Sequence, residues 1–205
     1  IVTNAAYKNL ILEQIPELTD NQILCEPSHN NTGPCVAYTA FKLAALDPNA
    51  NFIIAPSDHI VLKENAFLEK IQLALDFAAA NDALVTLGIQ PSRPDTGYGY
   101  IQMENEATPG IFKVKRFTEK PDFDTAKQFI ASGEYLWNAG IFIWNVRTIL
   151  AAYKNLSPDI FSILQQGSGL WNTPGEQGFI DKNYPTTPNI SVDFAIMEKA
   201  QNVFT

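Results

Sequence analysis

Asp58 and Asp193 are the residues of this sequence whose type and setting first suggest chemistry. Asp58 directly follows the apolar run "FIIAPS", and Asp193 lies near the start of a predicted helix in "NISVDFAIMEKA". An aspartate at a strand end suits a partial magnesium site, because Mg²⁺ takes one or two carboxylates and fills its other positions with water and substrate phosphate. Each aspartate also has a structural explanation, namely capping of a turn by Asp58 and capping of a helix by Asp193.

The loop "CEPSHNNTGPC", residues 25–35, has the composition and position of a nucleotide-contacting loop. It follows a predicted strand and precedes a predicted helix. Glu26 offers two acceptor oxygens that suit the adjacent N1–H and amino donors of guanine, and Gly33 allows a close approach of the backbone. A connecting loop with Asx turns explains the same residues equally well.

Three later motifs carry glycines and polar groups suited to a sugar phosphate. They are "RPDTGYGY" (93–100), "RFTEKP" (116–121) and "WNAG" (137–140), with Gly97, Gly99, Glu119, Lys120 and Asn138 as candidate residues. Carboxylate and amide groups bond sugar hydroxyls, whereas a lysine binds phosphate as a point charge. If the strand continues to them, Glu119 and Lys120 point to opposite sides. A bulge, a solvated strand end and a turn are the structural alternatives.

The elements that must position these residues alternate along the chain. Periodic apolar residues predict helices over 4–15, 34–46, 64–81, 122–132, 146–166 and 190–200. Strands are predicted over 22–25, 51–56, 83–88, 98–103, 111–120 and 135–144, with the pair flanking 104–110 forming a hairpin and residues 167–190 rich in loops.

This order predicts an α/β fold with a mixed, mainly parallel sheet flanked by helices. The strands at 22–25 and 51–56 are joined by a helix, which implies a parallel, right-handed crossover. Ligands then bind at the carboxyl ends of the parallel strands. Glu26, Ser57, Asp58 and the loop after Leu87 are therefore expected along one rim.

Composition and charge exclude several classes of function. The chain of 205 residues is 46% hydrophobic and has a net charge of −8, which provides no basic surface for nucleic acid. No apolar stretch approaches the roughly 20 residues of a membrane span, and no signal peptide is visible. Cys25 and Cys35, with only His29 nearby, match neither a disulfide scaffold nor a zinc site. These features predict a cytoplasmic globular protein with reduced thiols.

Six ordered segments closely resemble the mannose-1-phosphate guanylyltransferases, also called GDP-mannose pyrophosphorylases. They are "CEPSHNNTGPCVAY", "PSDH", "LGIQPSRPDTGYGYI", "RFTEKP", "YLWNAGIFIW" and "ISVDFAIMEKA". The resemblance implies a Rossmann-like (GT-A-like) nucleotidyltransferase fold. It also implies a reaction in which GTP and α-D-mannose 1-phosphate give GDP-mannose and pyrophosphate with Mg²⁺ as the cofactor.

The resemblance also assigns roles to particular residues. Catalytic roles fall to Asp58, Lys120 and Asp193, of which Asp58 and Asp193 are the implied metal ligands. The implied nucleotide-binding residues are Glu26, Asn31, Thr32, Gly33 and Ser57. The implied sugar-phosphate-binding residues are Gly97, Tyr98, Gly99, Glu119, Lys120, Asn138 and Gly140. The implied partners are GTP, mannose 1-phosphate and GDP-mannose, and the oligomeric state, a homo-oligomer included, stays open.

The chain also departs from the pattern of this family. The glycine-rich triphosphate loop and the C-terminal region of the family have no counterpart here, so residues 1–205 are expected to form a partial nucleotidyltransferase domain, truncated at both ends and catalytically incomplete. Gly33 and Cys35 stand where the family usually has alanine. The alternatives are a non-catalytic module that binds a nucleotide sugar or sugar phosphate, and a pyrophosphorylase for another sugar phosphate.

Overall fold

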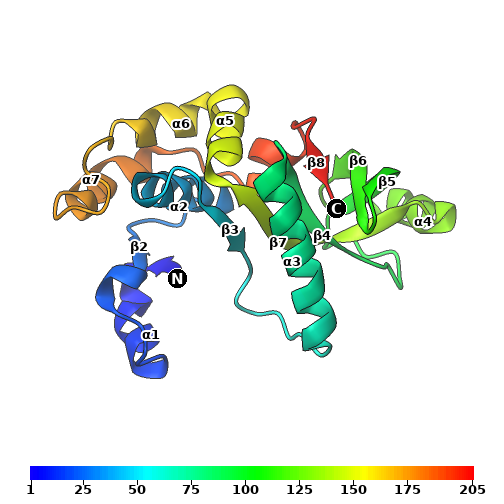
Figure 1. Ribbon diagram of the computed structural model, residues 1–205, viewed down its shortest axis with the longest axis horizontal. Helices are drawn as coiled ribbons and strands as arrows, with labels where there is room; N and C mark the ends of the chain where they lie inside the picture. Colours follow the sequence, from blue (N-terminus) through cyan, green and yellow to red (C-terminus); the bar gives the residue numbers. More distant parts are fainter. The chain divides into compact units, whose positions relative to one another are not determined.

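The computed structural model describes residues 1–205, which divide into two compact units. Unit 1 comprises Ile1–Pro48 and Leu150–Ile196, and unit 2 comprises Asn49–Ile149 and Met197–Thr205. Each unit has its own sheet and its own helices (Figure 1). Among these helices there is none with the length and apolar character that crossing a membrane demands.

Unit 1 combines a small parallel sheet with several helices. The sheet pairs β1 (Val2–Asn4) with β2 (Leu24–Glu26). The helices are α1 (Lys8–Gln14), α2 (Thr32–Leu46), α6 (Pro158–Gln165) and α7 (Glu176–Asn183), together with most of α5 (Val146–Leu156). Short helical turns are η1 (Ala5–Tyr7), η2 (Asp20–Gln22), η3 (Tyr184–Thr186) and all but the last residue of the π-helical η4 (Asp193–Met197).

Helix α2 begins directly after the predicted nucleotide loop, and its sequence explains both of its ends. The Asn31 side chain accepts a hydrogen bond from the backbone N–H of Thr32, and Pro34 occupies the first turn, where its missing N–H is not needed. The helix ends at Leu46 because Asp47 precedes a proline, which disfavours helical geometry in that residue. The last residue of the loop therefore caps the helix, so the position of the loop is fixed by the start of α2.

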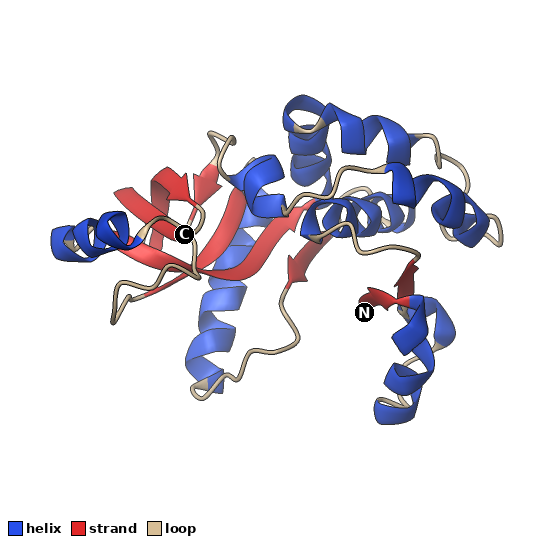
Figure 2. Ribbon diagram, turned by 180° about the vertical axis from the view of Figure 1, so that it is seen from behind, coloured by secondary structure: helices blue, strands red, loops and turns tan.

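Unit 2 is built around a six-stranded sheet with the order β3-β7-β4-β8-β6-β5. The strands are β3 (Asn51–Ile54), β4 (Leu84–Ile89), β5 (Tyr100–Thr108), β6 (Ile111–Thr118), β7 (Tyr135–Asn145) and β8 (Val203–Phe204). Figure 2 shows α3 (Glu64–Ala80) lying along one face of this sheet. Helix α4 (Phe123–Ser132) lies at the end of the sheet near β5 (Figure 1).

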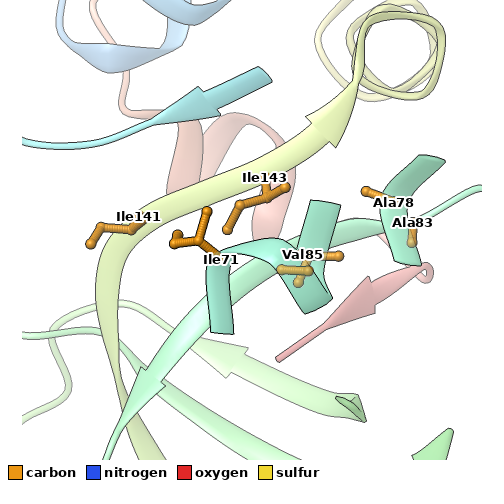
Figure 3. Close-up of a cluster of buried hydrophobic side chains, with 7 residues drawn as sticks. Ile71, Ala78, Ala83, Val85, Ile141 and Ile143 are labelled. Atoms are coloured by element: carbon orange, nitrogen blue, oxygen red, sulfur yellow. The ribbon is translucent and has the colours of Figure 1, made fainter. Parts of the chain in front are cut away.

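The core of unit 2 lies between α3 and the central strands. Ile71 and Ala78 on α3 face Val85 of β4 and Ile143 of β7 (Figure 3), and these side chains are at least nine-tenths buried. The alanine on this face of α3 lets the helix approach the sheet closely, and the branched side chains of the strands fill the space between the layers.

The predicted α/β class with a mixed sheet and flanking helices is confirmed, but antiparallel pairing dominates the sheet. Only β1–β2 and β4–β8 pair in parallel. The long apolar strand β7 lies antiparallel between β3 and β4, so these two strands point the same way without touching. The predicted crossover from residues 22–25 to 51–56 is wrong, because β2 pairs with β1 in unit 1 whereas β3 belongs to unit 2.

Three local predictions also need correction. The turn of the hairpin is shorter than 104–110, because β5 continues to Thr108 through several register shifts. Residues 167–190 are not only loop, since they contain α7 and η3. The helix predicted over 190–200 shrinks to η4, and Ser191 accepts hydrogen bonds from the N–H groups of Phe194 and Ala195 at its start.

Candidate functional site

The predicted site residues fall into two groups, one in each unit. The sheet-edge site of unit 2 comprises Ser57, Asp58, Gly97, Tyr98, Gly99, Glu119, Lys120, Asn138 and Gly140. The loop site of unit 1 comprises Glu26, Asn31, Thr32, Gly33 and Asp193.

The sheet-edge site centres on Gly99, Glu119 and Asn138, which three separate strands bring together. The backbone N–H of Asn138 donates to the carbonyl of Gly99 at 2.8 Å. A Cβ atom on Gly99 would lie 2.4 Å from Glu119 Oε2 and 3.3 Å from the Cβ of Asn138. Only glycine therefore leaves the Glu119 carboxylate in place.

Asn138 is held by a residue that sequence reasoning missed. Thr86 of β4 is fully buried, and its hydroxyl donates to Asn138 Oδ1 at 2.8 Å. The N–H of Gly140 donates to the same oxygen at 3.1 Å. Two donors on Oδ1 fix the orientation of the amide. The available signal was a hydroxyl residue in the apolar run "ALVTLG".

Glu119 and Lys120 lie just beyond the end of β6 and not within it. Their side chains meet in an ion pair of 3.5 Å, with 9% of the Glu119 side chain and 60% of the Lys120 side chain exposed. The expectation that they point to opposite sides depended on a continuing strand, but Lys120 turns the chain with a φ of 45°. A lysine with positive φ is uncommon and costs free energy, which makes this turn a candidate for a functional constraint. The N–H of Glu119 also donates to Glu198 Oε1 at 2.8 Å.

Ser57 and Asp58 follow β3 at the edge where β4 also ends, as predicted. Glu26 was predicted on the same rim, but it ends β2 in the separate two-stranded sheet of unit 1. Ser57 and Asp58 lie in a turn, and the exposed side chain of Asp58 makes no hydrogen bond or ion pair with the rest of the protein. Gly140 adopts a φ of 68° beside this loop, and a Cβ there would lie 3.6 Å from Pro56. Asp58 is thus the exposed carboxylate of the sheet-edge site.

Gly97 and Tyr98 belong to the loop between β4 and β5. The N–H of Gly97 donates to Asp95 Oδ1 at 2.8 Å, and the half-exposed ring of Tyr98 packs on Trp137 with ring centres 5.0 Å apart. These contacts order the loop that leads into Gly99.

The loop site is held by the segment that precedes and contains Asp193. Thr32 Oγ1 accepts a hydrogen bond from the N–H of Val192 at 2.9 Å, and the N–H of Gly33 donates to the carbonyl of Ile190 at 2.9 Å. A Cβ on Gly33 would lie 2.5 Å from that carbonyl oxygen, which explains why alanine does not fit here. Asp193 follows directly, so it lies beside the Asn31–Gly33 turn.

Glu26 has a partly buried carboxyl group with an altered ionisation. Burial raises its pKa above the usual value for glutamate, while hydrogen bonds from Tyr184 and Cys35 and the charge of His29 act in the opposite direction. Tyr184 is a second residue that sequence reasoning missed, because it lies within the segment predicted as loop.

The structure contains no cluster of three or more His, Cys, Asp and Glu side chains that could hold a metal ion. Asp58 and Asp193 belong to different units, so each unit supplies one of the two predicted carboxylates. A small set of oxygen donors is nevertheless what Mg²⁺ uses when water and phosphate complete its coordination.

The fold and these two sites agree with a class of enzyme that transfers nucleotidyl groups. The chain belongs to the nucleotidyl transferase family, whose model matches residues 1–170.

Individual proteins similar to this chain have more specific names than the family. A mannose-1-phosphate guanylyltransferase of Escherichia coli is 35% identical over 213 residues, which cover 98% of this chain and 45% of that protein. The alginate biosynthesis protein AlgA of Pseudomonas aeruginosa is 35% identical over 204 residues, covering 97% of this chain and 42% of that protein. A crystal structure described as a mannose-1-phosphate geranyltransferase from Thermus thermophilus has a TM-score of 0.85 at 25% identity, covering 99% of this chain and 56% of that one. The chain thus spans less than half the length of these two curated relatives.

Proposed function

We propose that the full-length protein forms GDP-mannose and pyrophosphate from GTP and α-D-mannose 1-phosphate. The observation that carries this proposal is the similarity to the Escherichia coli mannose-1-phosphate guanylyltransferase along 98% of this chain. Because the chain spans 45% of that relative, the activity is proposed for the full-length protein and not for residues 1–205 alone.

The sheet-edge site supports the sugar-phosphate half of this reaction. Glu119 and Asn138 present hydrogen-bonding groups suited to sugar hydroxyls, and the absence of a side chain at Gly99 leaves room for the Glu119 carboxylate beside Asn138. The exposed ammonium group of Lys120 can exchange part of its ion pair with Glu119 for the phosphate of the sugar.

The transfer step requires orientation and charge compensation more than covalent chemistry. A phosphate oxygen of the sugar phosphate forms a new bond to the α-phosphorus of GTP, and the bond from that phosphorus to pyrophosphate breaks in line. No side chain has to act as a nucleophile, so the residues serve to align two anions and offset their repulsion. Asp58 and Asp193 are the residues we expect to hold Mg²⁺, which when bound would neutralise charge on the phosphates.

A pyrophosphate-release assay of the full-length protein tests this function. With Mg²⁺, GTP and mannose 1-phosphate we expect turnover, and much slower turnover with ATP or UTP. A protein that binds GDP-mannose by calorimetry but catalyses nothing would instead be a binding module. Faster turnover with another sugar phosphate would identify a different pyrophosphorylase.

Asp58→Asn tests the role of the exposed carboxylate. The substitution should lower turnover by about 100-fold or more, the scale on which one electrostatic contact to a transition state acts. The melting temperature should change little, because the side chain is exposed and takes part in no hydrogen bond or ion pair. Steady-state kinetics and thermal unfolding measure the two effects.

Asp82→Asn is the matched control, because Asp82 is also exposed but precedes the opposite end of β4. It should leave both turnover and melting temperature unchanged. If Asp58→Asn lowers stability without a selective loss of activity, Asp58 is a structural cap and not a metal ligand.

A further inference from the structure

Glu26 is held by two donors, one distant in the sequence and one in the neighbouring helix α2. The hydroxyl of Tyr184 donates a hydrogen bond to Glu26 Oε1 across 158 positions of sequence. The side chain of Cys35, in the first turn of α2, is also hydrogen-bonded to Glu26. Burial, together with the charge and hydrogen bond of Glu26, raises the pKa of the thiol to about 12. The thiol therefore stays protonated and acts as a donor.

The surrounding fold fixes the position of Tyr184. Its side chain is fully buried, and its ring meets that of Tyr38 edge-on with centres 6.3 Å apart. Its carbonyl accepts hydrogen bonds from Asn30 Nδ2 at 3.1 Å and from the N–H of Thr187 at 3.0 Å. The direction of the hydroxyl is thus set before any ligand arrives, as preorganised binding requires.

A fixed carboxylate can discriminate between bases. Each carboxylate oxygen has two acceptor positions, so Oε1 can bond Tyr184 and still accept from a ligand, while Oε2 accepts alongside it. Guanine presents two adjacent N–H donors on one edge. Adenine and uracil place an acceptor atom beside each donor, and that acceptor would face a carboxylate oxygen.

We propose that Tyr184 is a positioning residue for base selection, which holds the Glu26 carboxylate in the orientation that accepts two adjacent N–H donors from one nucleobase. Cys35 supports the same orientation as a second, weaker donor. The inference rests on the function proposed above, in which Glu26 faces guanine.

The same contacts influence the ionisation of Glu26. The titratable groups that act on it are Tyr184, Cys35 and His29, and all three oppose the effect of burial. Removing the Tyr184 hydroxyl therefore raises the pKa of Glu26 further. A protonated carboxyl group is a poorer hydrogen-bond acceptor than a carboxylate. As the pH is lowered, guanine binding by a variant without the Tyr184 hydroxyl should therefore begin to weaken at a higher pH than in the wild-type protein.

Tyr184→Phe keeps the buried ring and removes only the hydroxyl. In calorimetric titrations of the full-length protein with Mg²⁺ and either GTP or ATP, we expect GTP affinity to fall about 10- to 100-fold, the range for loss of a hydrogen bond to a charged group. ATP affinity should not change. The acidic limb of the pH profile for GTP affinity should move to higher pH.

Tyr38→Phe is the matched control. Its hydroxyl is also buried and also donates to a carboxylate, that of Glu176 at 2.7 Å. This variant should lose stability but keep the preference for GTP over ATP. In a Glu26→Gln background, Tyr184→Phe should cause little further loss of selectivity, because Tyr184 acts through Glu26. If Tyr184→Phe does not fold, Cys35→Ala provides a second test with a smaller effect in the same direction.

The outcomes separate this inference from the proposed function. An unchanged GTP-to-ATP ratio in both Tyr184→Phe and Cys35→Ala would overturn the inference, as would additive effects of Tyr184→Phe and Glu26→Gln. A wild-type protein without base preference would also overturn it. A wild-type protein that binds GTP selectively but forms no product would contradict the proposed function alone.

Discussion

At Glu26, the ionised carboxylate that suits guanine binding is the form that burial destabilises. Burial raises the pKa of its carboxyl above the value in the unfolded chain. Its contribution to the free energy of unfolding is therefore fully present below the unfolded pKa and is lost as pH rises through the folded pKa. Glu26→Gln cannot ionise, so we expect it to melt at a higher temperature than the wild type at pH 7. The difference should shrink as pH falls toward about 4, where glutamate is protonated in both states.

Thermal unfolding between pH 4 and pH 8 measures this effect, and Glu13→Gln on the exposed surface of α1 is the control. A Glu26→Gln variant that is less stable than the wild type at pH 7 would show that the ionised carboxylate stabilises the loop site.

At the scale of single residues, the sequence identified candidate ligand-binding side chains by their chemical type, but it did not identify the residues that hold them in position. Glu26, Gly99 and Asn138 could be selected because their groups and spacing suit ligands. Tyr184 could not be selected, because its role depends on a contact across 158 positions. Thr86 stood out only as a hydroxyl residue in an apolar run, and its contact with Asn138 across 52 positions was not predictable.

Strand β7 is the element on which the core of unit 2 depends. Its Ile143 is completely buried, and it pairs with Val85 on one side and Ile53 on the other. Ile143→Ala should cost about 2–5 kcal/mol of unfolding free energy, because it removes buried methyl groups and leaves a cavity. Ile53→Ala, at the paired position on the edge strand β3, should cost much less, since Ile53 is 38% exposed. Denaturant unfolding of both variants checks the contrast, and equal costs would contradict it.

The elements themselves were easier to predict than their pairing. Apolar periodicity located α2, α3 and β7 within a few residues, because it reflects the face that each element buries. The insertion of β7 between β3 and β4 was not predictable, because a strand's partners are set by the whole sheet. The last predicted helix is replaced by η4, which was not predictable for the same reason, namely that it depends on distant contacts. The N–H of Val192, just before η4, donates to the hydroxyl of Thr32, which lies 160 positions earlier in unit 1.

Lys42 and Glu176 allow a test of whether the two units of the molecule unfold separately. Lys42 Nζ on α2 bonds both carboxylate oxygens of Glu176 on α7 at 2.7 Å, and the Glu176 side chain is only 9% exposed. Burial alone would raise the pKa of Glu176, but hydrogen bonds from Lys42, Tyr38 and Asn172 lower it overall. The carboxylate is therefore ionised at neutral pH and depends on its partners.

Lys42→Met keeps the apolar stem and removes the charge, which should cost about 3–5 kcal/mol, as is typical when one partner of a buried ion pair is lost. The ion pair lies entirely within unit 1, whereas Ile71 and Ile143 belong to the separate core of unit 2. We therefore expect hydrogen exchange to accelerate in α2 and α7 while amides of the unit 2 core keep their protection. Adding Glu176→Gln should restore part of the loss, because no buried charge is then left without its partner. Equal acceleration in both units would show instead that the molecule unfolds as one cooperative body.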